Sequence, residues 1–287
     1  MADTRYRPAT AKVPEVTAWF WIVKLATTAM GEAVSDYLVN DWNKYLGVLL
    51  GFIVFAVAIF FQFRSRDYST WRYWIAVSMV AVFGTMCADV LHVVLGVPYI
   101  GSFVLYAVLL AVTFTAWYRT EGTLDVHTIT TRRREAFYWL TVIFTFAMGT
   151  AVGDLTATTF HLGYLASAFM FLGALLVPLA AWRLGASPVA TFWVAYVLTR
   201  PAGASFADYF GMAKDASGLG AGHGPTSIVL IVVVAAGIVA LKLSGRDAQQ
   251  PILVPGRPAP GPAAPTGALL PDQTLNSTPW ARGSSPE

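Results

Sequence analysis

Four aspartates recur at the same position of a repeated pattern, each five residues after a glycine and fifteen after a tryptophan. The four copies are Trp21, Gly31 and Asp36; Trp74, Gly84 and Asp89; Trp139, Gly149 and Asp154; and Trp193, Gly203 and Asp208. Carboxylate oxygens are hard ligands that suit Mn²⁺, Mg²⁺ or Ca²⁺, and buried carboxylates also relay protons. The pattern therefore predicts an ion or proton site at these aspartates, with the four carboxylates as candidate metal ligands.

The elements that carry the aspartates are strongly apolar. The chain has 287 residues, of which 56% are hydrophobic and 12% charged, and its mean hydropathy of +0.58 is typical of an integral membrane protein. Runs long enough to cross a hydrocarbon core of about 30 Å lie at about 16–39, 44–63, 73–96, 99–118, 137–159, 163–182, 188–210 and 226–244. These continuous runs favour helices over the alternating strands of a barrel. We predict an all-α integral membrane protein with eight transmembrane helices.

The eight spans group into four two-helix repeats, at about 16–63, 73–118, 137–182 and 188–244. Because each repeat contributes two spans, the four patterned helices must run in the same direction, so the repeats are parallel. The fifteen residues from each Trp to its Asp cover about 22 Å of helix. We therefore expect the four Trp residues near the cytoplasmic interface, as packing elements and interface anchors, and the four Asp residues at one depth in the outer part of the membrane.

The chain ends differ from this membrane domain, which we place at 16–244. Residues 1–15 are short, polar and basic and are predicted to be a cytoplasmic leader. Residues 245–287 are rich in Pro and Gly and are predicted to be a disordered cytoplasmic tail. Basic residues gather in the loops on one side, whereas the opposite loops hold only Lys44 and Lys214. Both termini should therefore be cytoplasmic.

Small residues lie beside each aspartate. Each repeated glycine, Gly31, Gly84, Gly149 or Gly203, has a Gly, Ala or Ser four residues later on the same helix face. Such a small-xxx-small face lets helices approach closely in a membrane, so the glycines are assigned to repeat packing. One shared axis for the four carboxylates and two separate pairs are both open.

Three charged residues break the repeat symmetry. Glu32 is an extra acid where the later repeats have Thr85, Thr150 and Ala204, and Lys24 and Arg200 are intramembrane cations without charged equivalents. Glu32 is therefore added to the ion or proton site, and Lys24 and Arg200 are its predicted counter-charges, as permanent ion pairs or as switching groups. Thr85, Thr150 and His92 are auxiliary candidates. The competing interpretation is structural, with the aspartates capping helix ends and locking the bundle.

The N-terminal run Lys12-Val-Pro-Glu-Val-Thr-Ala-Trp-Phe-Trp, with Lys24 and Gly31-Glu32-Ala-Val-Ser-Asp36, resembles a family of bacterial membrane-anchored proteins. That family is built from four tandem two-helix repeats of unknown function, each with a characteristic Trp. The resemblance covers about residues 12–244. It implies the repeat architecture and a location in the bacterial inner membrane, and it assigns no active-site residue.

Missing motifs narrow the function. The chain has no Walker loop, nucleophile elbow, His-Glu-x-x-His pair, haem-attachment motif or dinucleotide fingerprint, so we expect no enzyme activity and no covalent cofactor. A net charge of +3, sorted by loop, gives no reason to expect nucleic-acid binding. The expected partner is the lipid bilayer, and a homo-oligomer stays open. The hypothesis is a secondary transporter that exports a divalent cation, its substrate, in exchange for protons. The alternative is a noncatalytic membrane scaffold or sensor with a structural acidic cluster.

Overall fold

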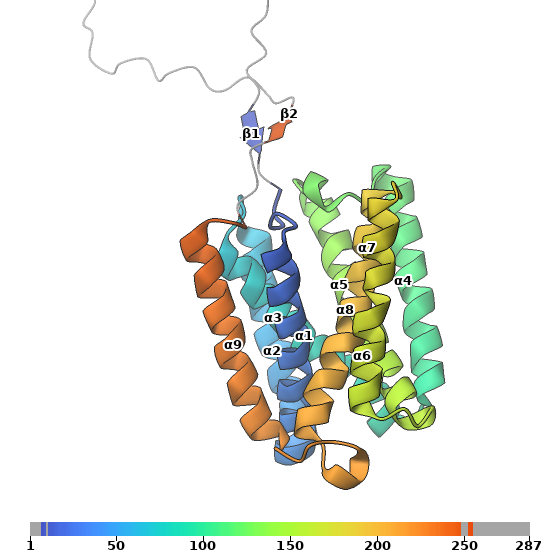
Figure 1. Cartoon of the computed structure of the whole chain (residues 1–287). Coiled ribbons are helices and arrows are strands. Elements are labelled where there is room, and N and C mark those ends of the chain that lie inside the picture. The colour runs from blue at the N-terminus through green and yellow to red at the C-terminus, as the bar shows by residue number, and fades with distance from the viewer. Residues whose placement is uncertain (1–6, 10, 248–251, 255–287) are drawn as a thin grey trace, which may run out of the picture. The chain divides into compact units, whose positions relative to one another are not determined.

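The computed structural model describes residues 7–9, 11–247 and 252–254 (Figure 1). The chain divides into two units, residues 8–252 and residues 1–7 together with 253–287. The first unit contains the helices. Most of the predicted tail, and residues 1–6 and 10 of the predicted leader, lie outside the described residues. Two three-residue strands are described, β1 (Arg7–Ala9) and β2 (Ile252–Val254).

Apart from those strands, the architecture is all-helical. The α-helices, in chain order, are α1 (Ala18–Asp36), α2 (Lys44–Arg64), α3 (Thr70–Asp89), α4 (Tyr99–Glu121), α5 (Arg132–Asp154), α6 (Tyr164–Ala174), α7 (Leu176–Arg183), α8 (Pro188–Gly211) and α9 (His223–Ser244). Short 3₁₀ turns lie at Val126–Thr128 and Lys214–Ala216.

Within the described residues, six helical stretches are long and apolar enough to cross a membrane. They are Ala18–Arg64, Thr70–Val94, Tyr99–Glu121, Arg132–Thr159, Tyr164–Arg183 and His223–Ser244. The prediction of eight separate spans is thus only partly matched. The first stretch runs for 47 residues through both α1 and α2, and α8, the predicted seventh span, is not among the six. Polar and small residues, including Arg200 and Asp208, lower the hydropathy of α8.

The helix widens directly after three of the four repeated aspartates. π-Helical segments begin at the residue after Asp36, Asp89 and Asp154, and cover Tyr37–Asn43, Val90–Val94 and Leu155–Thr159. Such segments are rare in proteins and are frequent at functional sites. In the fourth repeat, α8 instead continues as an α-helix from Asp208 to Gly211. The first three repeats therefore share a local change of winding at the level of their carboxylates, and the fourth lacks it.

Two prolines have different effects on the helices that contain them. The predicted span 163–182 is divided at Leu175 into α6 and α7. Pro178 follows the break, and its ring would clash with the carbonyl four residues earlier in a continuous helix. Pro201, by contrast, lies inside an uninterrupted α8.

The four patterned helices α1, α3, α5 and α8 run in the same direction and form a closed inner ring (Figure 1). At each repeated glycine, an added Cβ would collide with the next helix of the ring. The partners, in ring order, are Gly31 with Ala81, Gly84 with Phe146, Gly149 with Arg200, and Gly203 with Thr28. Each partner lies three residues before the glycine of its own repeat. The ring is thus a pseudo-fourfold arrangement that only small residues allow.

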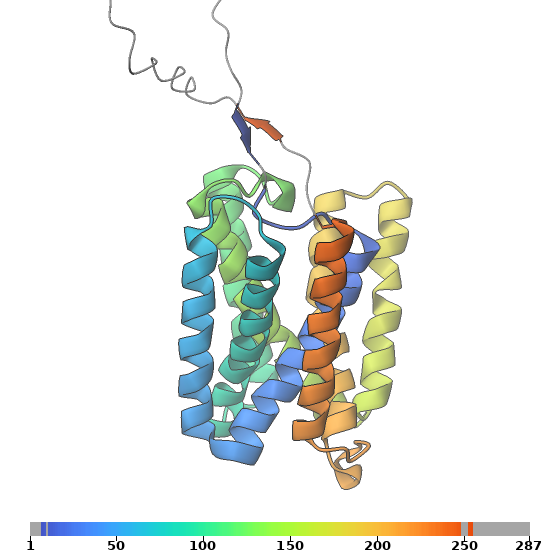
Figure 2. The same ribbon diagram turned by 90° about the vertical axis from the view of Figure 1, so that its left-hand side faces the viewer.

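The remaining helices lie outside this ring, and each packs on the inner helix of the next repeat. The pairs are α2 on α3, α4 on α5, α6 on α8, and α9 on α1 (Figures 1 and 2). The last pair joins repeat four to repeat one. Lipid-like side chains on the outer helices, such as Phe61 and Val232, are exposed on the surface of the bundle.

An aromatic layer fills the ring near the starts of the inner helices. Trp74, Trp139 and Trp193 are buried in the main core cluster. In the same layer, the hydroxyl oxygens of Tyr73 and Tyr138 are hydrogen-bonded to each other at 2.5 Å. Trp21 is half-buried and packs against that core. The four Trp residues are packing elements, as predicted. Trp74, Trp139 and Trp193 are not interface anchors, however, because their side chains fill the interior of the ring.

The leader contributes to the same end of the bundle. Residues 11–13 are buried, although the leader is expected from its sequence to be a polar extension. The Lys12 ammonium donates to a Glu135 oxygen at 2.6 Å, and the Gln62 amide donates to the other Glu135 oxygen at 3.1 Å. This buried ion pair ties the leader to α5 and α2.

Candidate functional site

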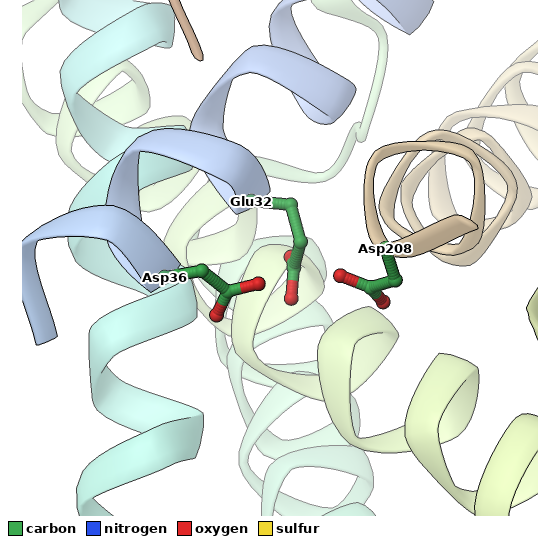
Figure 3. A group of neighbouring side chains, drawn as sticks. All are labelled: Glu32, Asp36 and Asp208. Carbon is green, nitrogen blue, oxygen red and sulfur yellow. The ribbon is translucent and has the colours of Figure 1, made fainter. Parts of the chain in front are cut away.

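Three carboxylates converge between α1 and α8, near the ends of these helices that lie away from the aromatic layer. Glu32 and Asp36 lie four residues apart and so share one face of α1, while Asp208 projects from α8 toward them (Figure 3). One oxygen from each of the three lies within 4.8 Å of the other two. Their exposed fractions are only 2%, 5% and 2%. We call these three residues the acid triad.

Several oxygens of the acid triad lack a protein donor. Among the residues that the structure describes, neither oxygen of Asp208 nor Oδ2 of Asp36 has a hydrogen-bond partner. The other Asp36 oxygen accepts from the Asn40 amide at 3.3 Å. Buried polar groups are nearly always paired, and an unpaired buried charge is costly. The free oxygens therefore call for a cation or for protons.

Arg200 is the direct counter-charge of the acid triad. Its guanidinium is fully buried and forms an ion pair with Glu32. The same nitrogen contacts the hydroxyl of Thr85 and that of Thr150, the latter at 2.5 Å. The other terminal nitrogen donates to the Thr28 carbonyl at 3.2 Å. Arg200 thus links α8 to α1, α3 and α5, and both predicted auxiliary threonines lie at this junction.

Lys24 has very different surroundings. Its side chain is 0% exposed, and its ammonium lies 4.2 Å from the Phe146 ring centroid and 4.3 Å from that of Tyr196. Within residues 11–247 the ammonium has no hydrogen-bond partner. The aromatic faces attract the cation, but no acid of the described part of the chain forms an ion pair with Lys24. Of the two predicted counter-charges, only Arg200 contacts the acid triad.

The other two repeated aspartates lie outside the acid triad. Asp89 accepts a hydrogen bond at 3.3 Å from Ser35, the neighbour of Asp36. Asp89 and Asp154 are both half-buried, and their charges act on one another and on Glu32. The structure therefore brings Asp36 and Asp208 together with Glu32. Asp89 and Asp154 are not part of this group.

The predicted auxiliary histidine lies away from the acid triad, and a different histidine lies beside it. His92, the auxiliary candidate, bonds to the Val97 carbonyl at 2.9 Å and stacks on Tyr99. It belongs to the connection between α3 and α4. His223, which is not among the sequence candidates, places Nε2 3.8 Å from Oδ2 of Asp36. The one hint in the sequence is the run of glycines around His223, which leaves room for close approach.

The arrangement matches a repeat family. The family model described as "Repeat of Unknown Function (DUF347)" matches the chain four times, at residues 19–68, 72–123, 137–185 and 191–247. The fourfold internal repeat is thus confirmed. No curated protein and no solved structure matches the chain. Since the four matches cover most of the chain, the protein belongs to the family built from this repeat of unknown function.

Proposed function

We propose that this protein is a secondary transporter of the bacterial inner membrane that binds a divalent cation at the acid triad and exports it in exchange for protons. The observation that carries the proposal is the Asp208 carboxylate. It is buried, neither oxygen has a donor within the described part of the chain, and it faces two further acids. Hard oxygen ligands of this kind suit a divalent cation.

Charge supports a cycle that alternates between a cation and protons. Three ionised carboxylates against the single guanidinium of Arg200 give the site a formal charge of minus two. One dication neutralises that charge, and so do two protons. Intramembrane acids are costly to maintain and commonly mark ion pathways or proton relays.

The surfaces of the helices support a location in a membrane. The outer helices expose lipid-like side chains, and many polar and charged side chains of the inner helices are buried. In our proposal α8 is a span despite its lower hydropathy, because much of its surface packs against α1, α5 and α6 and not against lipid. Counting α6 and α7 as one span gives eight spans. By the positive-inside rule, both termini are then cytoplasmic.

The test is cation flux in proteoliposomes that contain the full-length protein. With a proton gradient, the wild type should move Mn²⁺ across the membrane. Mutation of a residue that only supports a metal ligand lowers metal affinity or activity about 10- to 100-fold. Because Asp208 is proposed as a ligand itself, Asp208→Asn should slow the flux at least that much. Asp215→Asn is the matched control, because Asp215 is an exposed acid in the α8–α9 connection.

The same experiment decides on the alternative of a scaffold or sensor. That alternative has one observation in its favour, the Arg200 junction that joins all four inner helices. It predicts that Asp208→Asn alters the thermal stability of the protein while neither form carries any divalent cation. Equal flux in the wild type and Asp208→Asn would also end the transport proposal.

A further inference from the structure

His223 stands at the edge of the acid triad. It is the first residue of α9, and its side chain is only 13% exposed. Nδ1 lies 3.3 Å from an Asp41 oxygen, while Nε2 lies 3.8 Å from Oδ2 of Asp36. Both Nε2 of His223 and Oδ2 of Asp36 are buried without a hydrogen-bond partner in the described residues. Two unpaired atoms therefore face each other.

This pattern resembles that of a metal-binding histidine. Metal-ligating histidines almost always donate their second ring N–H to a carboxylate, a carbonyl or water, which fixes the tautomer and the ring orientation. Asp41 is placed to accept that hydrogen bond at Nδ1. Nε2 then carries the free lone pair and lies 3.8 Å from Oδ2 of Asp36.

The backbone around His223 is shaped for this position. Gly211, three residues after Asp208 on α8, faces the imidazole, and an added Cβ there would lie 2.6 Å from Cδ2 of His223. Gly222, directly before His223, has a φ of +84°, which L side chains rarely adopt. Both glycines are thus required for α8 and α9 to bring the ring against the acid triad.

We propose that His223 supplies a nitrogen ligand to the acid triad, and that the site therefore takes a first-row transition-metal dication in preference to Mg²⁺ or Ca²⁺. The inference rests on the proposed cation site and adds a ligand and a substrate class to it. Mg²⁺ and Ca²⁺ are bound through oxygen ligands. Imidazole nitrogen favours the transition metals, and carboxylates still accept Mn²⁺.

The distance between His223 and Asp36 is close to that expected for two ligands of one ion. Metal–ligand bonds of about 2.0–2.2 Å separate neighbouring ligand atoms by roughly 3.0–3.6 Å. The 3.8 Å between Nε2 and the Asp36 oxygen is close to that range. The three carboxylate oxygens lie within 4.8 Å of one another, and Nε2 of His223 lies farther than that from at least one of them, so the acids and the imidazole must move closer together around the ion.

The test is pulsed electron paramagnetic resonance of Mn²⁺ bound to the detergent-solubilised full-length protein. A directly bound imidazole gives a nitrogen modulation of the Mn²⁺ signal. We expect this modulation in the wild type, its loss in His223→Asn, and its retention in His161→Asn. His161 is an exposed histidine with a φ of 57°, a conformation that Asn tolerates well, so this control should fold.

Competition of Mn²⁺ against Ca²⁺ on the same samples measures the selectivity. The preference for Mn²⁺ should fall about tenfold or more in His223→Asn, within the range for changes around metal ligands, and stay unchanged in His161→Asn. Mn²⁺ that binds through Asp208 but shows no nitrogen modulation in the wild type would overturn the His223 inference and leave the acid triad as the site. Failure of every dication to bind would overturn both.

Discussion

At the residue scale, the two buried cations Arg200 and Lys24 differ in the groups that surround their charges. Arg200 has an acid and two hydroxyls around its guanidinium, whereas Lys24 has only aromatic faces. Both cations contact the same ring, that of Phe146. Its centroid lies 5.2 Å from the Arg200 guanidinium carbon and 4.2 Å from the Lys24 ammonium. Arg200 therefore holds Glu32 in place, whereas the Lys24 ammonium lies against Phe146 and Tyr196 and contacts no acid among the described residues.

Arg200→Met should strongly destabilise the protein. Removing one partner of a buried ion pair leaves an uncompensated charge and costs about 3–5 kcal/mol. Arg133→Met is the control, because the Arg133 side chain is 68% exposed and its partner Glu121 keeps a second ion pair, with Arg134 at 2.8 Å. Scanning fluorimetry in detergent should show a large drop in melting temperature for Arg200→Met alone. Equal melting temperatures for the two variants would contradict the described role of Arg200.

Lys24→Met, unlike Arg200→Met, should leave the stability of the protein unchanged or raise it. The substitution nearly preserves volume and removes a fully buried ammonium that has no hydrogen-bond partner within the described residues. The lost attraction to two aromatic faces is about 2 kcal/mol, which is smaller than the usual cost of burying an unpaired charge. The same melting assay should give an unchanged or higher melting temperature. A drop as large as that of Arg200→Met would mean that Lys24 is paired in solution.

At the element scale, the closed ring depends on glycines that face the neighbouring helix. The sequence predicts which residues form this face, since the four glycines repeat at equal spacing. It does not predict the order of the helices around the ring, because a single sequence indicates depth and face but no lateral neighbours. The sequence therefore does not predict that Asp36 and Asp208 meet while Asp89 and Asp154 stay outside the acid triad.

Gly84→Ala should destabilise the ring, whereas Gly173→Ala should not. A Cβ at Gly84 would lie 2.6 Å from Cβ of Phe146, and neither atom can rotate away. Overpacking of this kind typically costs about 1–3 kcal/mol. At Gly173 on α6, an added Cβ has no atom within 4 Å. Melting temperatures of the two purified variants compare the sites, and a Gly84→Ala protein as stable as Gly173→Ala would refute the close packing.

The histidines and tryptophans show why part of the site escaped prediction. His223 lies in a glycine-rich stretch that is typical of flexible loops, and its contact with Asp36 spans most of the chain. The Trp residues fit an interface belt by depth alone, but three of them turn inward. Burial of this kind depends on which helices are neighbours. Repeat spacing, helical class and the acids themselves, by contrast, are local properties of the sequence.

At the scale of the whole molecule, the account requires that the acid triad lie toward the outer side of the membrane and the leader toward the cytoplasm. The α8–α9 connection lies at the end of the ring near the acid triad, and the α2–α3 connection lies near the leader. The charge asymmetry between the two sets of loops favours this direction.

Cysteine labelling on intact cells tests this orientation. In a Cys87→Ser background, which removes the single native thiol, a membrane-impermeant maleimide should label Asp215→Cys. Arg66→Cys should react only after the cells are permeabilised. Both parent side chains are exposed, so accessibility within the protein is matched. The reverse pattern would place the acid triad on the cytoplasmic side and exclude the proposed direction of export.

The most direct measurement of the central claim is an anomalous-scattering map of the full-length protein crystallised with MnCl₂. The account predicts one metal peak bounded by Glu32, Asp36 and Asp208, with metal–oxygen distances of about 2.0–2.3 Å. A map at saturating Mn²⁺ that shows no peak there, with both Asp208 oxygens and Oδ2 of Asp36 paired to protein donors, would contradict it.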